Sequence, residues 1–292
     1  MGRRLAAEHR AARDTMSEAN EALGMSLTRL CFEGPDADLV RTENAQPAIL
    51  AISIAAWRAL TTEIEVRPVW LAGHSLGEYT ALVVAGALAF PDALRLVRTR
   101  GRLMQSAVPE GVGAMAAIIG PSDEEVETLC ATAAQGEVVA AANFNGAGQV
   151  VIAGHRTAVR RAAEAGRRAG ARVMELAVSA PFHCALMAPA AEGLARVLAD
   201  VPIGPLDVPV VTNVEAAVND DPARVRTLLV QQVTAPVRWG DSMRLLRRLG
   251  CSHAFEIGPG QVLTKLLQRM KLGVDAVAAG EGEGWAAVAG VA

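Results

Sequence analysis

The sequence has few aromatic residues and no long hydrophobic run. Aromatic residues make up 3% of the 292 residues and hydrophobic residues 51%, so Ala, Val and Leu must build the core. No apolar run reaches the length of a bilayer-spanning helix, and residues 1–14 form a polar amphipathic pattern instead of a signal peptide. Ala6 stands where a myristoylation site needs Ser or Thr. We therefore expect a soluble cytoplasmic protein with no membrane partner.

Cysteine and net charge are also scarce. The four cysteines, Cys31, Cys130, Cys184 and Cys251, lie far apart and form no C-x-x-C pair, which argues against a zinc site and against a disulfide framework. The net charge of -3 gives no general attraction to nucleic acid. We therefore expect no metal site and no nucleic-acid partner.

The hydrophobic patterns predict an α/β protein with one insertion. Helical patterns fill the first third of the chain, and strand and helix patterns alternate after residue 179. Between these parts the order is β-α-β-β-α-β, as in a ferredoxin-like unit. We predict a large α/β domain with a mostly parallel sheet from residues 1–109 and 180–292, and a small ferredoxin-like domain from residues 110–179. The Gly/Ala-rich tail after Gly280 is predicted to be loosely held.

The motif "GHSLG" at residues 73–77 is the first candidate for chemistry. An apolar run ends at Ala72 and a helical pattern follows the motif, so the segment turns sharply from a strand into a helix. Such a G-x-S-x-G elbow presents a serine hydroxyl, here that of Ser75, at the top of a sheet. The first N–H groups of the new helix, including that of Leu76, point toward an oxyanion on an attacked carbonyl. The motif predicts a nucleophilic serine, although so short a match also occurs by chance.

A serine nucleophile needs a base, and one of the five histidines is well placed for this role. His183 lies in "SAPFHCALM", a strand-to-helix loop at the return to the large domain, whereas the other histidines fit surface, capping or buttressing positions. A helix-capping role remains the alternative for His183. No carboxylate presents itself as a third member, so we predict a Ser-His dyad whose imidazole is held by a backbone carbonyl.

Arg100 lies in the centre of an apolar helix face. On a helical wheel it shares this face with Leu96, Val97, Leu103 and Met104. A buried arginine needs an anionic partner. Two interpretations remain open at this point: a structural salt bridge, or a two-point grip on a substrate carboxylate.

Several motifs together resemble the malonyl-CoA:acyl carrier protein acyltransferases of fatty-acid and polyketide synthesis. They occur in the order of that family: "GHSLGEYTALVVAGAL", "RTRGRLMQ", "GAMAAIIG", "AANFNGAGQVVIAG", "PFHCALM", and "APVRW" followed by "FEIGPGQVL". The resemblance spans nearly the whole chain. It implies an α/β-hydrolase-like large domain with a ferredoxin-like small one, and transfer of malonyl from malonyl-CoA to the phosphopantetheine thiol of acyl carrier protein. It implies no metal and no bound cofactor, and we expect a monomer.

The resemblance also implies roles for individual residues. Ser75 matches the nucleophile, His183 the base and then the acid, Arg100 the clamp for the malonyl carboxylate, and the Leu76 N–H an oxyanion donor. Further matches are Gln232, whose backbone carbonyl orients the histidine, Phe182, which narrows the pocket beside the malonyl α-carbon and makes methylmalonyl-CoA a poor substrate, and Asn143, which binds substrate.

The beginning of the chain departs from the family pattern. Family members start with a strand and a Gly-Gln-Gly loop, whereas "MGRRLAAEH" already resembles the helix after that loop. We expect that Met1 is an internal start and that the full protein carries this segment upstream. Two alternatives to a malonyl transferase remain. A serine esterase or thioesterase would use the same elbow and histidine but has no need of Arg100. A carrier-protein-binding module with impaired chemistry would fit the missing Gly-Gln-Gly loop.

Overall fold

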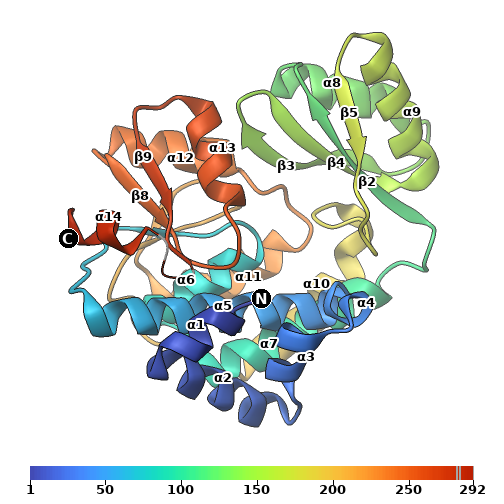
Figure 1. The fold of residues 1–292 in the computed structure, drawn as a ribbon. Coiled ribbons are helices and arrows are strands. Elements are labelled where there is room, and N and C mark those ends of the chain that lie inside the picture. The colour runs from blue at the N-terminus through green and yellow to red at the C-terminus, as the bar shows by residue number, and fades with distance from the viewer. Residues whose placement is uncertain (281, 283, 292) are drawn as a thin grey trace.

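The first part of the chain is helical. The computed structural model describes residues 1–280, 282 and 284–291 (Figure 1). Five helices come first: α1 (Arg3–Glu8), α2 (Arg10–Leu23), α3 (Leu27–Glu33), α4 (Asp36–Leu39) and α5 (Thr42–Glu63). The long helix α5 is buried on most of its sides, because α2, α6 and α7 all pack against it. A helix that is apolar all round belongs in the middle of a core.

The large unit contains two short sheets that are covered by helices. In the first sheet β1 (Leu71–Ala72) pairs in parallel with β6 (Val210–Val211), which pairs in antiparallel with β7 (Val218–Asn219). In the second sheet β8 (His253–Glu256) and β9 (Asp275–Ala278) are parallel. The helices are α6 (Leu76–Val84), α7 (Phe90–Ser106), the 3-10 turn η1 (Ala185–Met187), α10 (Ala188–Ala199), α11 (Pro222–Gln232), α12 (Trp239–Arg248), α13 (Val262–Met270) and α14 (Trp285–Ala289). The α/β prediction is confirmed: in the described part of the large unit β1–β6 and β8–β9 pair in parallel, and β6–β7 pairs in antiparallel.

A four-stranded antiparallel sheet forms the second unit, at the upper right of Figure 1. Its elements are β2 (Gly113–Ile119), α8 (Asp123–Ala134), β3 (Val139–Gly146), β4 (Gln149–His155), α9 (Arg156–Arg168) and β5 (Arg172–Glu175). The strand order is β3-β4-β2-β5 and all pairs are antiparallel, which is the ferredoxin-like arrangement. The domain boundaries at residues 109/110 and 179/180 remain a prediction.

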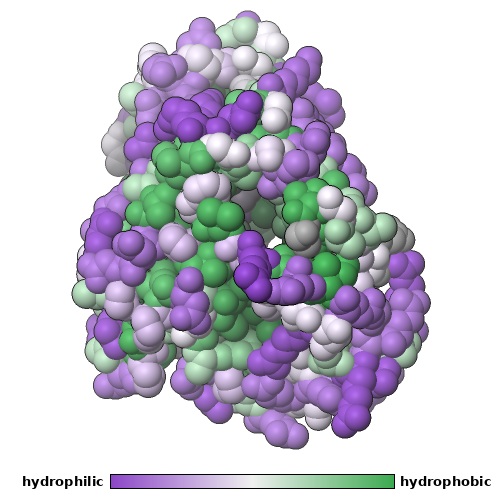
Figure 2. Space-filling view, turned by 90° about the vertical axis from the view of Figure 1, so that its left-hand side faces the viewer, coloured by the Kyte–Doolittle hydropathy of each residue, from purple (hydrophilic) through white to green (hydrophobic). Residues whose placement is uncertain are grey.

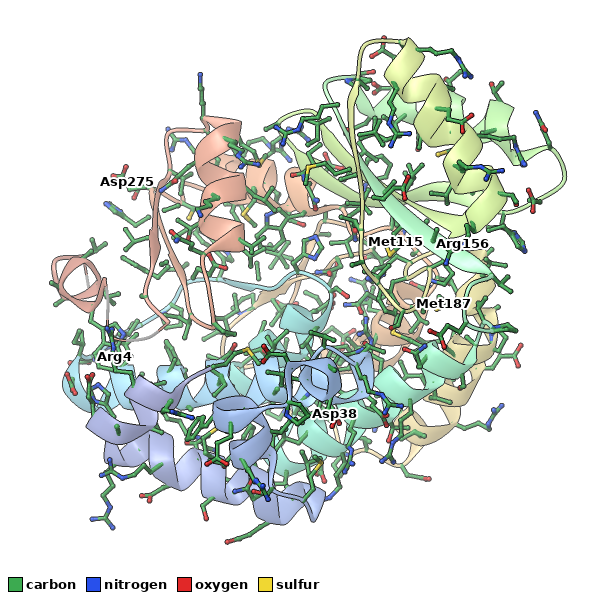
Figure 3. All side chains as sticks on the ribbon, turned by 45° about the vertical axis from the view of Figure 1, so that its right-hand side comes forward. Arg4, Asp38, Met115, Arg156, Met187 and Asp275 are labelled. Atoms are coloured by element: carbon green, nitrogen blue, oxygen red, sulfur yellow. The ribbon has the colours of Figure 1, made fainter. Side chains whose placement is uncertain are left out.

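Alternation along the strands directs the two faces of this sheet toward different partners. Ala116 and Ile118 of β2 pack with residues of α8 and α9, whereas Met115 and Ala117 pack on the opposite face with Cys184. Figure 3 shows Met115 and Met187 where the sheet meets the helices of the large unit. The inner face of the sheet therefore lies over the loop that carries His183.

The C-terminal helix α14 packs against the core of the large unit. Trp285 of α14 is 6% exposed, and its Nε1 donates to the carbonyl of Ala279 at 2.8 Å. The prediction of a loosely held tail is therefore wrong for the described part. Residues 281, 283 and 292 lie outside the described residues.

Figure 2 shows the face on the side of β8 and β9, where hydrophobic residues gather in the middle. Among the described residues, no helix combines the length and the hydropathy that a bilayer crossing requires.

Candidate active site

The elbow between β1 and α6 holds Ser75 in an unusual backbone conformation. Its φ and ψ are 50° and -103°, a region that residues with a side chain rarely adopt. The turn is so tight that a Cβ on Gly73 would lie 2.0 Å from the carbonyl carbon and oxygen of Gly77, which explains the glycine. Leu76 is the first residue of α6, and the first N–H groups of a helix have no acceptor within the helix.

Ser75 and His183 meet although they lie far apart in the sequence. The Oγ of Ser75 lies 2.8 Å from Nε2 of His183, and Nδ1 of His183 lies 2.8 Å from the backbone oxygen of Gln232. Because a carbonyl only accepts, Nδ1 carries the proton and Nε2 accepts from the serine hydroxyl. Burial, and then the charge of Arg100, lower the pKa of His183 to about 3. The imidazole is therefore neutral and ready to take a proton.

Arg100 reaches the same hydroxyl from α7. It is 2% exposed, and its Nη2 donates to Ser75 Oγ at 3.1 Å and to Oε1 of Gln232 at 2.9 Å, while Nη1 donates to Oε1 of Gln46 at 2.7 Å. All three acceptors are uncharged, so no carboxylate among the described residues forms the hydrogen-bonded salt bridge that the sequence left open. Burial lowers the pKa of the guanidinium, but arginine remains a cation in proteins.

Three buried polar residues that the sequence analysis missed hold these groups in place: Gln46, Glu78 and Asn213. The amide of Asn213 clamps the elbow, because Oδ1 accepts from the Ser75 N–H at 2.6 Å and Nδ2 donates to the carbonyl of Gly73 at 2.7 Å. Glu78 Oε2 accepts from Nε2 of Gln232 at 2.7 Å and from the Asn213 N–H at 3.1 Å. In the sequence, the signal for Glu78 was a lone carboxylate one helical turn after the elbow serine. The signal for Asn213 was a lone amide shortly after a strand.

The four-stranded sheet contributes to the site through β3. Oδ1 of Asn145 lies 2.9 Å from Nε2 of His74, whose ring is 5.7 Å from that of Trp239. Asn143 is 6% exposed, and its Nδ2 has no hydrogen-bond partner among the described residues. Next to it, the Phe144 N–H donates to the carbonyl of Val237 at 2.9 Å. These contacts join β3 to the segment before α12.

Phe182 directly precedes His183 in the chain. It is half-buried and packs against the core of the large unit and against the inner face of the four-stranded sheet. The structure thus brings Ser75, His183, Arg100 and Gln232 within hydrogen-bond distance, and it places Leu76, Phe182 and Asn143 on the elements around them. The roles of these residues remain predictions.

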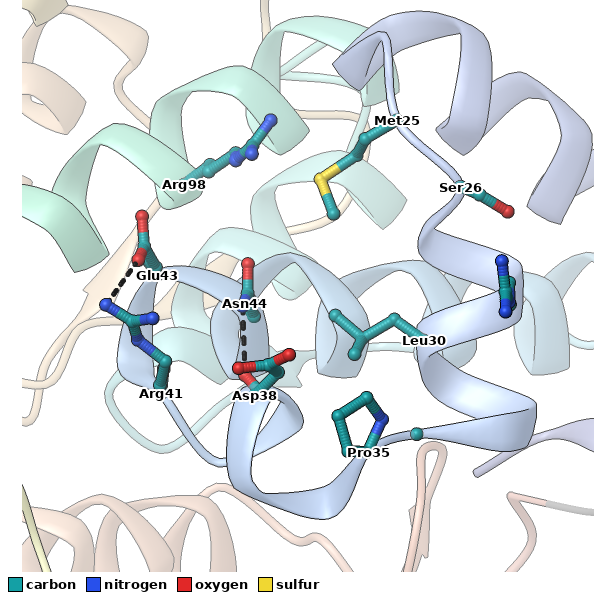
Figure 4. A pocket seen from close by; sticks show the side chains of 11 residues that line it. Met25, Ser26, Leu30, Pro35, Asp38, Arg41, Glu43, Asn44 and Arg98 are labelled. Atoms are coloured by element: carbon teal, nitrogen blue, oxygen red, sulfur yellow. Dashed lines mark hydrogen bonds and ion pairs between the residues drawn. The ribbon is translucent and has the colours of Figure 1, made fainter.

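Other chemistries have little support in the described residues. Burial raises the pKa of the thiols of Cys31 and Cys184 to about 11 and that of Cys130 to about 12, which makes these cysteines poor nucleophiles. No group of three His, Cys, Asp or Glu side chains in the described part of the chain is arranged to hold a metal ion. A surface recess lined by Leu30, Pro35 and Arg98, among others, contains none of the site residues (Figure 4).

Comparisons with known proteins agree with this geometry. Residues 1–279 match the sequence model of a family described as "Acyl transferase domain". The malonyl CoA-acyl carrier protein transacylase of Salmonella typhimurium is 47% identical over 267 residues, which cover 91% of this chain and 86% of that protein.

Solved structures agree as well. The crystal structure of an acyl carrier protein S-malonyltransferase from Vibrio cholerae is 46% identical, with a TM-score of 0.94 over 97% of this chain and 93% of that chain. A malonyl-transacylase solved in complex with its type II PKS acyl-carrier protein is 43% identical, with a TM-score of 0.97 over 100% of this chain and 95% of that one. The resemblance predicted from the motifs is confirmed. The chain belongs to the acyl transferase family, in the group of malonyl CoA-acyl carrier protein transacylases.

Proposed function

We propose that this acyltransferase moves a malonyl group from malonyl-CoA to the phosphopantetheine thiol of an acyl carrier protein through a malonyl ester on Ser75. One observation carries the proposal: the Ser75 hydroxyl lies within hydrogen-bond distance of the neutral imidazole of His183 and of the buried guanidinium of Arg100. A nucleophile, a base and a cation for a substrate carboxylate thus meet at one atom.

The proposed reaction has two balanced halves. Ser75 Oγ attacks the thioester carbon as its proton passes to Nε2 of His183, and the carbon–sulfur bond then breaks while the leaving thiol of CoA takes this proton. In the second half the carrier thiol gives its proton to Nε2 and attacks the serine ester, and Ser75 Oγ recovers a proton as it leaves. The backbone oxygen of Gln232 holds the imidazole, and the Leu76 N–H faces the oxyanion. These steps require no cofactor.

Arg100 gives the proposed site its acyl preference. The free carboxylate of a malonyl ester sits at the far end of a short chain from Ser75 Oγ, within reach of a guanidinium that contacts this oxygen in the free protein. Phe182 narrows the pocket beside the α-carbon, and Asn143 offers an unpaired buried N–H to substrate. We therefore propose that malonyl-CoA is preferred over acetyl-CoA and methylmalonyl-CoA.

The partner and the compartment follow from the same proposal. A relative of this fold was solved with its acyl-carrier protein, and we propose such a protein as the acceptor here, in the cytoplasm. The product serves fatty-acid or polyketide synthesis.

Isotope-labelled malonyl-CoA tests the proposed function. We expect stable label on Ser75 in intact-protein and peptide mass spectra, and its transfer to the holo form of a carrier protein but not to the apo form, which lacks the thiol. Rapid release of free malonate with no transfer would identify a hydrolase instead. Absence of both label and release would identify a binding module.

A further inference from the structure

One buried carboxyl group beside the active site takes no part in the reaction proposed above. Glu78 lies on α6, one turn after Ser75, and is 3% exposed. Its Oε2 accepts two hydrogen bonds, from Nε2 of Gln232 at 2.7 Å and from the N–H of Asn213 at 3.1 Å. Ionisable side chains are rarely buried to this extent unless another group compensates for the lost hydration.

The hydrogen bonds of Gln232 and Asn213 compensate first, followed by the charge of Arg100, which Glu78 reaches through a single amide. Arg100 Nη2 donates to Oε1 of Gln232, and Nε2 of the same amide donates to Glu78. The amide cannot turn over, because Nε2 also donates to the carbonyl of Ser75 at 3.0 Å and a carbonyl only accepts. A fixed dipole therefore joins the buried cation to the buried carboxyl group.

We propose that Glu78 is a positioning residue which, through the Gln232 amide, sets how strongly Arg100 holds the carboxylate of the acyl group. The proposal rests on the proposed function, in which Arg100 binds that carboxylate. In the free protein Arg100 has Glu78 as its charged neighbour. When a malonyl carboxylate arrives, two carboxyl groups share one guanidinium, and an ionised Glu78 weakens the binding by repulsion.

The charge of Glu78 changes near neutral pH, whereas the groups around it keep theirs. Burial raises the pKa of Glu78 to about 7 against the opposing effects of Gln232, Asn213 and Arg100. Burial lowers the pKa of His183 to about 3 and also lowers that of His74, while it raises that of Tyr79 to about 12. Near and above pH 7 both imidazoles and the phenol are therefore neutral and Arg100 is positive. Glu78 is the group of this cluster that titrates.

A pH series on the wild-type protein is the direct test. Below the pKa of Glu78 this side chain is protonated, and the malonyl carboxylate is the one negative charge beside Arg100. Above that pKa the Glu78 carboxylate is also negative and repels the malonyl carboxylate. We expect the KM for malonyl-CoA to rise on the order of tenfold from about pH 6 to about pH 8.5, as for a mutual pKa shift of about one unit. The KM for acetyl-CoA, which has no free carboxylate, should stay flat. Ionisations of the CoA moiety affect both KM values alike and therefore cancel in the ratio of the malonyl-CoA KM to the acetyl-CoA KM.

The variant Glu78→Gln separates the charge from the hydrogen bonds. The new amide oxygen can accept both bonds that Oε2 accepts, but the side chain is neutral at every pH. We expect the malonyl-CoA KM of this variant to stay at the low-pH value of the wild type at every pH. Glu43→Gln is the matched control, since it removes a carboxylate that pairs with Arg102 on the outer side of α7, and it should keep the wild-type pH dependence.

The outcomes distinguish this proposal from the proposed function. If Arg100→Ala lowers malonyl and acetyl transfer equally, the proposed grip on the carboxylate fails. If Arg100→Ala lowers malonyl transfer selectively but the wild-type ratio of the two KM values does not change with pH, the role of Glu78 is overturned while the function stands. Should Glu78→Gln fail to fold, the wild-type series still gives the answer.

Discussion

The four-stranded sheet and the site around Ser75 on the large unit differ in how far apart their residues lie in the sequence. The sheet and its two helices come from one contiguous segment, Gly113–Glu175. The site on the large unit joins Ser75 to His183 across 108 positions and Arg100 to Gln232 across 132 positions. Local sequence therefore determines the first region, whereas the second exists only when distant segments fold together.

The two regions also differ in what they supply. The groups of the described residues that hydrogen-bond to the Ser75 hydroxyl, on His183 and Arg100, belong to the large unit, whereas the sheet contacts the elbow through the pair of Asn145 and His74. This difference indicates that changes on the large unit alter the chemistry, whereas changes in the core between the sheet and its helices, away from Asn143 and Asn145, alter stability. The following predictions test that division.

Ser75→Ala should have the largest effect. It removes the atom that forms the ester, so covalent labelling by malonyl-CoA should disappear and turnover should fall by a factor on the order of 10⁴ or more. Intact-protein mass spectrometry checks the label. Ser106→Ala, at the exposed end of α7, is the control and should label normally. Label on another residue of the Ser75 variant would end the covalent mechanism proposed here.

His183→Ala should come close to the same loss. Without the imidazole nothing takes the proton from Ser75, and residues that act as a unit are not additive, so the double variant with Ser75→Ala should be no worse than the single variants. Stopped-flow acylation with malonyl-CoA measures the effect, and His253→Ala, at the start of β8, serves as the control. Acylation within tenfold of wild type would show that His183 is not the base.

Arg100→Ala should produce a smaller and selective loss. A charge-assisted hydrogen bond contributes roughly 1.5–3 kcal/mol, so malonyl transfer should fall about tenfold to a hundredfold more than acetyl transfer. The measurement is kcat/KM with both thioesters, and Arg102→Ala, an exposed neighbour on α7 paired with Glu43, should leave the ratio unchanged. Equal losses with both thioesters would show that Arg100 is structural.

Sequence patterns predicted the first region element by element. Ser122 forms a capping box with Glu125 at the start of α8, a signal that neighbouring residues provide on their own. In the large unit the apolar periodicity of α7 predicted the burial of Arg100, because burial follows from the face of a single helix. What Arg100 contacts did not follow, since Gln46 and Gln232 lie on other helices.

Glu78 and Asn213 were missed for a related reason. A lone Glu on a helix and a lone Asn after a strand are usually exposed, and only the packing of distant segments buries these two. The prediction that the tail is loosely held was wrong because it used the Gly/Ala composition alone. The single Trp285, whose side chain bonds to Ala279, anchors the tail. Patterns thus predict which face is buried, but not which polar groups meet there.

Ile152→Ala should lower stability without altering the chemistry. Ile152 lies on β4, is 0% exposed and packs in the core between the four-stranded sheet and its helices. Such a truncation costs about 2–5 kcal/mol of the free energy of unfolding, which urea denaturation measures. Val262→Ala, 66% exposed, is the control and should cost little. If kcat per folded Ile152→Ala molecule drops more than about tenfold, the sheet is part of the catalytic machinery and the division fails.

The smallest expected effect is that of acid on acetyl transfer, and it tests whether the large unit keeps its imidazole neutral. With a pKa of about 3, His183 remains a free base well below neutral pH, because the base form is present above the pKa and is lost only as the pH falls through it. The kcat/KM for acetyl-CoA should therefore change by less than about twofold from pH 8 to pH 5. With the ordinary pKa of roughly 6.5, only about 3% of the imidazole would be neutral at pH 5, and the rate would fall roughly thirtyfold. Circular dichroism at each pH controls for unfolding. A thirtyfold fall with the fold intact would mean that water reaches the dyad and that the burial of His183 does not keep its imidazole neutral.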